Sequence, residues 1–304
     1  PHNSAHLFGF SYAPITCNST TTFCRRKSKM TFIQSIGRNT LTLQASNSDL
    51  VTRQDHDGYA TLTMTNPSRR NALSAAMMAA LQKAFDQIAD EKNIRCVILA
   101  AEGPVFCAGH DLKEMNGISE CDQHASLFAQ CSKLMMRIVS LPQPVIARVR
   151  GMATAAGCQL VASCDLAVAA TSSKFATPGV NIGLFCSTPM VALSRNVARK
   201  HAMRMLLTGD PIDANTAFAM GLVSDVVSDD DLESHTDALA AGIAARSGMT
   251  VQLGKQAFYR QIEMPLADAY GFASDVMTAN MQKHDAQEGI GAFVEKRHPT
   301  WRHE

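Results

Sequence analysis

Two runs of small residues have the composition of backbone turns that could bind an anion. The first is Gly103-Pro-Val-Phe-Cys-Ala-Gly-His-Asp-Leu-Lys-Glu114, in which a strand end turns into a helix predicted to start near Asp111. The second is Gly151-Met-Ala-Thr-Ala-Ala-Gly-Cys-Gln-Leu160, which leads from a strand into a helix through about Ser163. Such turns expose N–H groups at a helix N-terminus, where negative charge is favoured, and small side chains let a ligand approach the main chain.

Two N–H donors that converge from these turns would form an oxyanion hole. An oxyanion hole could stabilise an enolate or a tetrahedral oxyanion on a thioester carbonyl by several kcal/mol. The same runs are also compatible with two ordinary tight turns in an α/β core. Spacing alone leaves both interpretations open.

Strands and helices alternate around these turns. Residues 59–64 alternate as in a strand, and the short apolar run 95–100 predicts a buried strand. Helical spacing connects Leu73, Met77, Leu81, Phe85 and Ile88 in a helix that we predict to end near Glu91. A further helix is predicted over about 124–140, with strands over 144–149 and 165–169. This alternation predicts an α/β fold with a parallel component.

The two ends of the chain differ from this middle part. Residues 1–50 are rich in Ser, Thr and Asn and have Asp49 as their one acidic residue, which is the composition of a transit peptide. An unstructured tail without an address is the alternative, and Met30 is a plausible start. Beyond about His201 the pattern is helical, apart from a possible strand over 222–227. We place a boundary near Arg246, between a core over 51–246 and a helical C-terminal region over 247–304.

Composition argues against several classes of protein. Lys and Arg number 28 against 27 for Asp and Glu, and the one basic run lies at 25–29, so nucleic acid is not expected as a partner. No run approaches the roughly 18 apolar residues of a membrane span. The nine cysteines include no CxxC pair, and we interpret them as reduced thiols without a disulfide framework or a zinc site. HExxH, GxSxG and P-loop motifs are also missing, so we expect no metal.

Several runs resemble the crotonase, or enoyl-CoA hydratase/isomerase, superfamily. They keep the family order from about Asp55 to the C-terminus. The runs are Asn71-Ala-Leu-Ser74, Phe106 to Glu114, Gly157-Cys-Gln-Leu-Val-Ala-Ser-Cys-Asp165, Leu207-Thr-Gly-Asp210, Gly221-Leu-Val223 and Glu288-Gly-Ile-Gly-Ala-Phe-Val-Glu-Lys-Arg297. Within the superfamily, the runs 103–114, 153–164 and 175–189 resemble a mitochondrial branch.

The resemblance implies a spiral of ββα repeats with a helical C-terminal trimerisation region, as a homotrimer or a dimer of trimers. It implies that N–H groups of Ala108 and Ala156 hold the thioester oxygen of an acyl-CoA. The CoA nucleotide would lie against residues 108–111, which include Gly109 and His110. Phe293 and Lys296 would contact CoA. The equally good alternative is that Phe293 is a buried aromatic residue and Lys296 a solvated lysine, without a role in binding. CoA enters as part of the substrate, and no separate cofactor is implied.

Departures from the family pattern bear on the activity. Family hydratases use two glutamates as general acid and base, and these positions correspond here to Gln159 and Gly179. A Gln amide has no titratable proton, and Gly has no side chain. An isomerase base position corresponds to Ser187, which is no base unaided. His110, Asp111 and Asp165 remain as titratable groups, for which we expect a solvent- or CoA-facing histidine and, for Asp165, capping or an internal hydrogen bond.

We therefore interpret the chain as an acyl-CoA-binding protein of mitochondrial fatty-acid metabolism that retains the oxyanion hole and lacks both hydratase glutamates. Thioester cleavage or decarboxylation, which need little beyond oxyanion stabilisation, would suit such a site. One alternative is a pseudoenzyme that regulates a partner without turnover. Another is a residual hydratase or isomerase with a relocated base.

Overall fold

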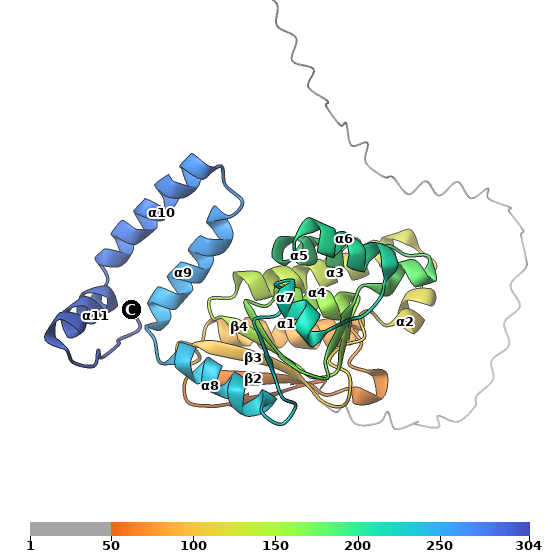
Figure 1. The fold of residues 1–304 in the computed structure, drawn as a ribbon, viewed down its shortest axis with the longest axis horizontal. Coiled ribbons are helices and arrows are strands. Elements are labelled where there is room, and N and C mark those ends of the chain that lie inside the picture. Colours follow the sequence, from red (N-terminus) through yellow and green to blue (C-terminus); the bar gives the residue numbers. More distant parts are fainter. Residues whose placement is uncertain (1–49) are drawn as a thin grey trace, which may run out of the picture. The chain divides into compact units, whose positions relative to one another are not determined.

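The computed structural model describes residues 50–304 and builds them around a six-stranded sheet (Figure 1). Its strands are ordered β1-β2-β3-β4-β6-β9. β1 runs antiparallel to β2, and every other neighbouring pair is parallel, as predicted. The strands are β1 (Val51–Asp55), β2 (Tyr59–Met64), β3 (Cys96–Ala101), β4 (Val145–Val149), β6 (Leu166–Ala170) and β9 (Asp225–Val227).

A second sheet has three strands, and one of them leads directly into the second of the two turns described above. It joins β5 (Met152–Thr154), β7 (Lys174–Ala176) and β8 (Ile212–Asp213). β5 pairs with β7 in parallel, and β7 pairs with β8 antiparallel. The second turn therefore begins at the end of a strand that belongs to this smaller sheet.

Both faces of the larger sheet are buried. In β3, Val97 and Leu99 join the main core, whereas Cys96, Ile98 and Ala100 join a second cluster on the opposite face. Successive side chains of a strand point to opposite faces, so a strand covered on both sides must be apolar throughout. This burial explains why the run 95–100 has no polar alternation.

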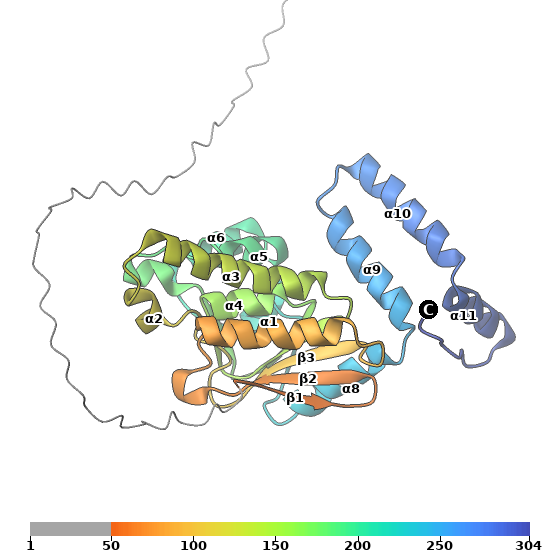
Figure 2. The same cartoon turned by 180° about the vertical axis from the view of Figure 1, so that it is seen from behind.

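One face of the larger sheet is covered by α1, α3 and α4 (Figure 2). Ser74 begins α1 by accepting a hydrogen bond from the N–H of Met77 at 3.2 Å, which is a typical N-cap. The helices before the C-terminal region are α1 (Ala75–Ala89), α2 (Leu112–Asn116), α3 (Cys121–Ser140), α4 (Ala156–Ser163), α5 (Pro189–Asn196), α6 (Arg199–Thr208) and α7 (Ala214–Ala219), with short 3₁₀ helices η1 (Pro67–Arg69) and η2 (Pro178–Ile182).

The other face is covered by α8 (Leu232–Ala244), whose Leu232, Ala240 and Ala244 belong to the second cluster. Three helices follow: α9 (Gly248–Gln261), α10 (Leu266–Met281) and α11 (His284–Glu295). They bury few of their own residues and expose many large apolar ones, such as Leu266 at 75% and Phe293 at 85%. None of the helices within residues 50–304 is long and apolar enough to cross a membrane.

The predicted elements largely correspond to the observed ones. The helix expected from about residue 124 begins earlier, at Cys121, because Glu120 is the last residue with extended backbone before it. The possible strand over 222–227 is β9, which spans only Asp225–Val227. The transit-peptide prediction for residues 1–50 lies outside the described residues, apart from Leu50.

Candidate functional site

The first turn connects β3 to α2 through residues 102–111. Gly109 adopts a φ of 82°, a conformation that strongly favours glycine. Asp111 then begins α2, because its Oδ1 accepts hydrogen bonds from the N–H groups of Lys113 at 3.0 Å and Glu114 at 3.3 Å. The predicted helix start near Asp111 is confirmed.

The second turn connects β5 to α4 through Ala155. Ala155 has φ 52° and ψ −119°, which is unfavourable for a residue with a Cβ. Its own N–H donates to the carbonyl of Ala176 at 2.9 Å, and this bond fixes the turn against β7. The helix α4 starts at Ala156 and is buried along its whole length. The hydrogen bond to β7 and the buried helix α4 therefore hold the backbone of this turn in an unusual conformation.

The two turns are joined directly by main-chain hydrogen bonds. The N–H of Cys107 donates to the carbonyl of Met152 at 3.1 Å, and the N–H of Thr154 donates to the carbonyl of Cys107 at 3.0 Å. A Cβ on Gly157 would lie 2.2 Å from the Cys107 oxygen, so no side chain fits there. A Cβ on Gly109 would lie 3.1 Å from the nitrogen of Ala156. The glycines thus let the two turns meet where the sequence predicted a shared site.

The two expected N–H donors are in different states. Ala156 is the first residue of α4, so its N–H has no acceptor within the helix, and no other described residue accepts from it. The N–H of Ala108 donates to the carbonyl of Arg70 at 3.1 Å. The expectation that both donors are free is therefore wrong for Ala108. The acceptor comes from the 66–71 turn, which no motif had connected with the site.

The two positions that the resemblance assigns to the family glutamates are buried. Gln159 is 5% exposed, and its Oε1 lies 4.0 Å from the thiol of Cys131. Among the described residues, no acceptor is bonded to the Gln159 amide nitrogen. A Cβ on Gly179 would lie 2.8 Å from the carbonyl oxygen of Leu184 and 2.9 Å from the thiol of Cys186. The loop after η2 therefore fills the space that a side chain at position 179 would need.

A buried thiol lies beside each of these two positions: Cys158 precedes Gln159 in the chain, and Cys186 lies next to Gly179. Burial raises the pKa of Cys158 to about 12, with a smaller contribution from the nearby Cys186 thiol. Burial also raises the pKa of Cys186. Both are free thiols, and neither is a nucleophile at neutral pH, because the thiolate is the reactive form.

His110 retains one unused ring nitrogen. Its Nδ1 lies 3.4 Å from the carbonyl oxygen of Leu73, and because a carbonyl only accepts, this contact favours the tautomer with the proton on Nδ1. Its Nε2 is buried and has no hydrogen-bond partner, and Phe128 packs edge-on against the ring at 5.6 Å between centroids. Burial lowers the pKa of His110. The solvent-facing alternative for His110 is therefore wrong, because the imidazole is mostly buried and has a free ring nitrogen, whereas the CoA-facing alternative stays a prediction.

The two aspartates are engaged elsewhere. Asp111 is 8% exposed, caps α2 and forms an ion pair with Arg69. Burial raises the pKa of Asp111, but the capping N–H groups and Arg69 outweigh it and lower the pKa overall. Asp165 accepts hydrogen bonds from the N–H of Val145 and the ammonium of Lys255, both at 2.7 Å. The expected internal hydrogen bond of Asp165 is confirmed, and neither aspartate is free to act as a base.

The remaining predicted residues lie farther along the chain. Ser187 is exposed, and its hydroxyl donates weakly to the carbonyl of Phe185 at 3.4 Å. Phe293 projects from α11 with 85% of its surface exposed, so within one chain it is not the buried aromatic that we considered as an alternative. Lys296 follows α11 in a left-handed conformation with φ 57°. α11 packs against α9 and α10, and the predicted CoA contacts of Phe293 and Lys296 stay predictions.

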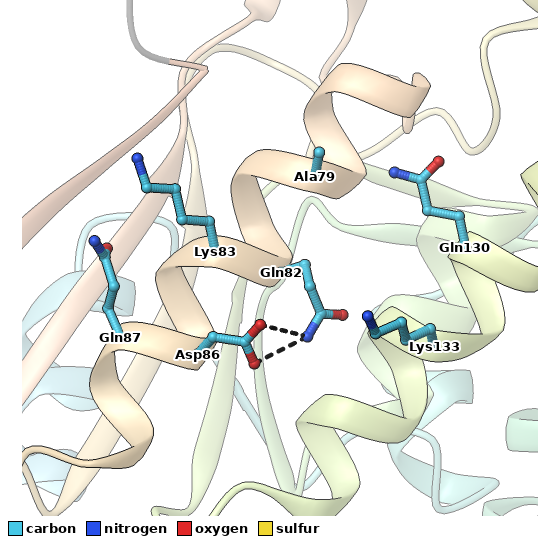
Figure 3. A pocket seen from close by; sticks show the side chains of 7 residues that line it. All are labelled: Ala79, Gln82, Lys83, Asp86, Gln87, Gln130 and Lys133. Atoms are coloured by element: carbon cyan, nitrogen blue, oxygen red, sulfur yellow. Dashed lines mark hydrogen bonds between the residues drawn. The ribbon is translucent and has the colours of Figure 1, made fainter.

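A separate polar groove of about 640 Å³ lies on the outer surface between α1 and α3 (Figure 3). Its lining includes Lys83 and Lys133, and Gln82 donates to Asp86 at 3.0 Å across one helical turn. None of these residues belongs to the two turns. We therefore separate this groove from the candidate site.

Known proteins are similar to this chain in both sequence and structure. Residues 54–304 match the family model described as Enoyl-CoA hydratase/isomerase. The chain is 50% identical over 254 residues to the Enoyl-CoA hydratase domain-containing protein 3, mitochondrial, of Rattus norvegicus, covering 84% of this chain and 85% of that protein. Its identity to the Homo sapiens protein of the same name is 52% over 248 residues, covering 82% of each.

Two solved structures are similar to a comparable degree. The crystal structure of human enoyl Coenzyme A hydratase domain-containing protein 3 superposes with a TM-score of 0.81 at 50% identity, covering 83% of this chain and 100% of that one. A crystal structure of enoyl-CoA hydratase from Mycobacterium smegmatis gives the same TM-score of 0.81 at 50% identity, covering 83% of this chain and 98% of that one.

Proposed function

This chain belongs to the enoyl-CoA hydratase/isomerase family, and we propose that it binds acyl-CoA thioesters at the two joined turns while hydrating enoyl-CoA slowly or not at all. The family match confirms the predicted resemblance and the crotonase-type fold. The observation that carries the proposal is the pair of buried positions Gln159 and Gly179, which have no titratable group where family hydratases are expected to have two.

Chemistry at these positions supports slow hydration. Adding water to an enone requires a base to activate the water and an acid to deliver a proton to the α-carbon, and each typically contributes about 10²- to 10⁴-fold in rate. The Gln159 amide can orient a group by hydrogen bonding but cannot exchange a proton. Position 179 has no side chain, and Leu184 and Cys186 close on it. Oxyanion stabilisation is then the main contribution left to the site.

The oxyanion donors support thioester binding more directly than any side chain does. The N–H of Ala156 is unengaged at the start of α4, where the helix dipole favours negative charge. The N–H of Ala108 donates to the carbonyl of Arg70 and is not available in this arrangement. A thioester oxygen about 3 Å from the Ala156 nitrogen would receive a hydrogen bond from it.

A second candidate function, a residual hydratase with a relocated base, is favoured by one atom. His110 Nε2 has no partner in the described structure, and it carries a lone pair in the tautomer that the Leu73 contact favours. His110 is next in sequence to Gly109, where an added Cβ would lie 3.1 Å from the Ala156 nitrogen. The lowered pKa of His110 keeps the ring neutral at physiological pH. Asp111 and Asp165 offer no comparable free atom.

Assembly and location extend the proposal. We infer a homotrimer or a dimer of trimers that forms through the C-terminal helices, because Leu266, Tyr270 and Phe293 expose 70% or more of their surface. Apolar exposure on this scale favours a protein interface. Relatives named mitochondrial, together with the composition of residues 1–50, support a mitochondrial location. The proposed binding of acyl-CoA thioesters extends the proposal to a role in fatty-acid metabolism.

The test begins with thermal shift against free CoA, acetyl-CoA, butyryl-CoA and palmitoyl-CoA. A ligand at 100 times its dissociation constant stabilises the folded state by about 2.7 kcal/mol, so a binding chain length raises the melting temperature measurably. Loss of the crotonyl-CoA enone absorbance then reports hydration. Stabilisation by acyl-CoA with almost no loss of absorbance is the expected result. No stabilisation by any thioester would contradict the proposal and would favour a regulatory protein without an acyl-CoA site.

A further inference from the structure

Ala155, in the second turn, has a backbone conformation that glycine favours. Among the described residues, the other non-glycine residues with positive φ are Arg70, Asn71, Lys296 and His303. Arg70 and Lys296 combine a positive φ with ψ values of 36° and 39°, which is the ordinary left-handed region. Ala155 instead combines φ 52° with ψ −119°, the conformation of the first central residue of a type II′ turn, where glycine is strongly preferred. The methyl group of Ala155 therefore strains the turn.

Packing of the methyl group does not offset this strain. Ala155 is only partly buried at the edge of the main core, whereas Ala156 is completely buried. A partly buried methyl group contributes less free energy than a backbone conformation of this kind costs. The bond from the Ala155 N–H to the carbonyl of Ala176 and the pairing of β5 with β7 hold the turn in place. The fold thus imposes the strain, and the methyl group gains no matching stability from its own contacts.

The same methyl group lies beside the oxyanion donor. At ψ −119° the Cα–Cβ bond of an L residue is nearly eclipsed with the bond to the next nitrogen, so the Ala155 methyl group and the Ala156 N–H lie side by side. Contacts across the two turns agree with this placement, because a Cβ on Gly109 would lie 2.9 Å from the Ala155 Cβ and 3.1 Å from the Ala156 nitrogen. An oxygen that accepts from the Ala156 N–H is therefore next to the methyl group.

Resting on the proposed function, we infer that Ala155 is a specificity-determining residue whose methyl group limits the width of the acyl group at its α-carbon. A thioester oxygen bonded to Ala156 brings the carbonyl carbon close to this methyl group. All CoA thioesters share the sulfur and the CoA arm, so the methyl group can discriminate between them only through the acyl group. A straight chain has one carbon attached to the α-carbon, whereas a branched chain has a second carbon that meets the methyl group.

A single side chain sets this width. Gly109 faces the Ala155 methyl group from the first turn and has no side chain of its own. Gly157 follows the donor residue and lies against the carbonyl of Cys107. Of these three positions, only position 155 has a side chain, so Ala155→Gly removes the restriction. Glycine also suits the backbone conformation of this position, and the variant should fold.

Two isomeric ligands isolate the effect. Butyryl-CoA and isobutyryl-CoA contain the same atoms and differ only in the branch at the α-carbon. Valeryl-CoA and isovaleryl-CoA differ by a branch one carbon farther from the thioester and serve as the control pair. Arg70→Gly is the control variant, because Arg70 is also left-handed but has an exposed side chain outside the second turn.

We expect calorimetry to show that the unmodified protein binds butyryl-CoA about tenfold more tightly than isobutyryl-CoA, which is the usual effect of one misplaced carbon in a packed site. Ala155→Gly should reduce this ratio to about threefold or less. The ratio for the control pair should stay the same, and Arg70→Gly should change neither ratio. Ala155→Gly should also raise the melting temperature by about 2–4 °C, because relief of strain outweighs the added freedom of the unfolded chain.

Other results would contradict the inference in different ways. A merely structural role of the methyl group would lower the melting temperature of Ala155→Gly and leave the butyryl to isobutyryl ratio as it is in the unmodified protein. If both isomers bind the unmodified protein equally well, the inference about Ala155 is also wrong, and the proposed function stands. If no acyl-CoA binds the unmodified protein, the proposed function itself is wrong, and the role of Ala155 falls with it.

Discussion

The ammonium of Lys255 lies 2.7 Å from Oδ2 of Asp165, a residue 90 positions earlier in the chain. The two side chains are 5% and 15% exposed. Lys255 also donates to the carbonyls of Ile138 and Gln143, both at 3.0 Å, so all three of its N–H donors are used. This contact fixes α9 to the strands of the larger sheet and explains why Asp165 is unavailable for proton transfer.

Removing the cation from this pair should destabilise the fold strongly. In Lys255→Met, the carboxylate of Asp165 stays buried without its counter-ion, and breaking a buried pair in this way costs about 3–5 kcal/mol of unfolding free energy. Urea unfolding measures the loss. The control is Glu263→Gln, which breaks the exposed pair with Arg195 and should cost about 0–1 kcal/mol. Equal losses in the two variants would show that the Asp165–Lys255 pair contributes no more than a surface ion pair.

A methyl group at the first turn should obstruct the oxyanion site. The added Cβ of Gly109→Ala lies 2.9 Å from the Thr154 carbonyl and 3.1 Å from the Ala156 nitrogen, in a backbone conformation with φ 82°. We expect affinity for butyryl-CoA to fall at least about tenfold, because one oxyanion donor and the close approach to it are lost. Gly117→Ala, at the end of α2, has only contacts of 3.4 Å and should bind normally. Unchanged affinity in a folded Gly109→Ala would place the ligand elsewhere.

The sequence predicted those parts of the site that depend on local pattern. Period-two and helical spacing located most of the elements, and the glycines near residues 109 and 157 indicated a close backbone approach, which the contacts of Gly157 with Cys107 confirm. A turn of small residues can be recognised in the sequence, because the backbone conformation that requires these residues is set within the turn itself. The start of α2 at Asp111 followed from the same kind of reasoning.

What the sequence did not predict depends on contacts between distant segments. Arg70 contacts Ala108 from a turn that the Asn71 amide binds to carbonyls 31 and 34 residues away. Asn71 belongs to a run that was noted for its family resemblance, and its preference for left-handed backbone was a signal that could have identified the turn. The Lys255 partner of Asp165 had no such signal, because an amphipathic helix does not reveal which distant carboxylate it meets.

Stability should depend on pH through His110. Burial lowers the folded-state pKa of His110 below its ordinary value of 6.5, so the unfolded chain binds more protons in acid. The neutral ring carries no penalty above about pH 6.5, and stability falls as the pH drops from there through the folded-state pKa. Urea unfolding at about pH 7.5 and pH 5 should therefore show a smaller acid loss in His110→Gln than in the unmodified protein.

The exposed His201 provides the matched control for this measurement. His201→Gln should keep the full acid loss. An identical loss in all three proteins would mean that other groups set the acid sensitivity. In that case His110 would titrate as an ordinary histidine, and its role as a neutral base in the second candidate function would lose its main support.

Introducing glutamates at positions 159 and 179 is the most direct test of the proposal that hydration is slow or absent. Unmodified protein should hydrate crotonyl-CoA far more slowly than a homologue with two glutamates, since each acid or base is worth about 10²- to 10⁴-fold. Gln159→Glu with Gly179→Glu should raise the rate of enone loss, whereas either change alone leaves one proton transfer unassisted. The Gly179 change should also lower the melting temperature, because its Cβ meets the Leu184 carbonyl at 2.8 Å. Gly254→Glu, which meets nothing within 4 Å, is the stability control. Rapid hydration by the unmodified protein would instead favour His110 as the base, since Asp111 and Asp165 are both engaged.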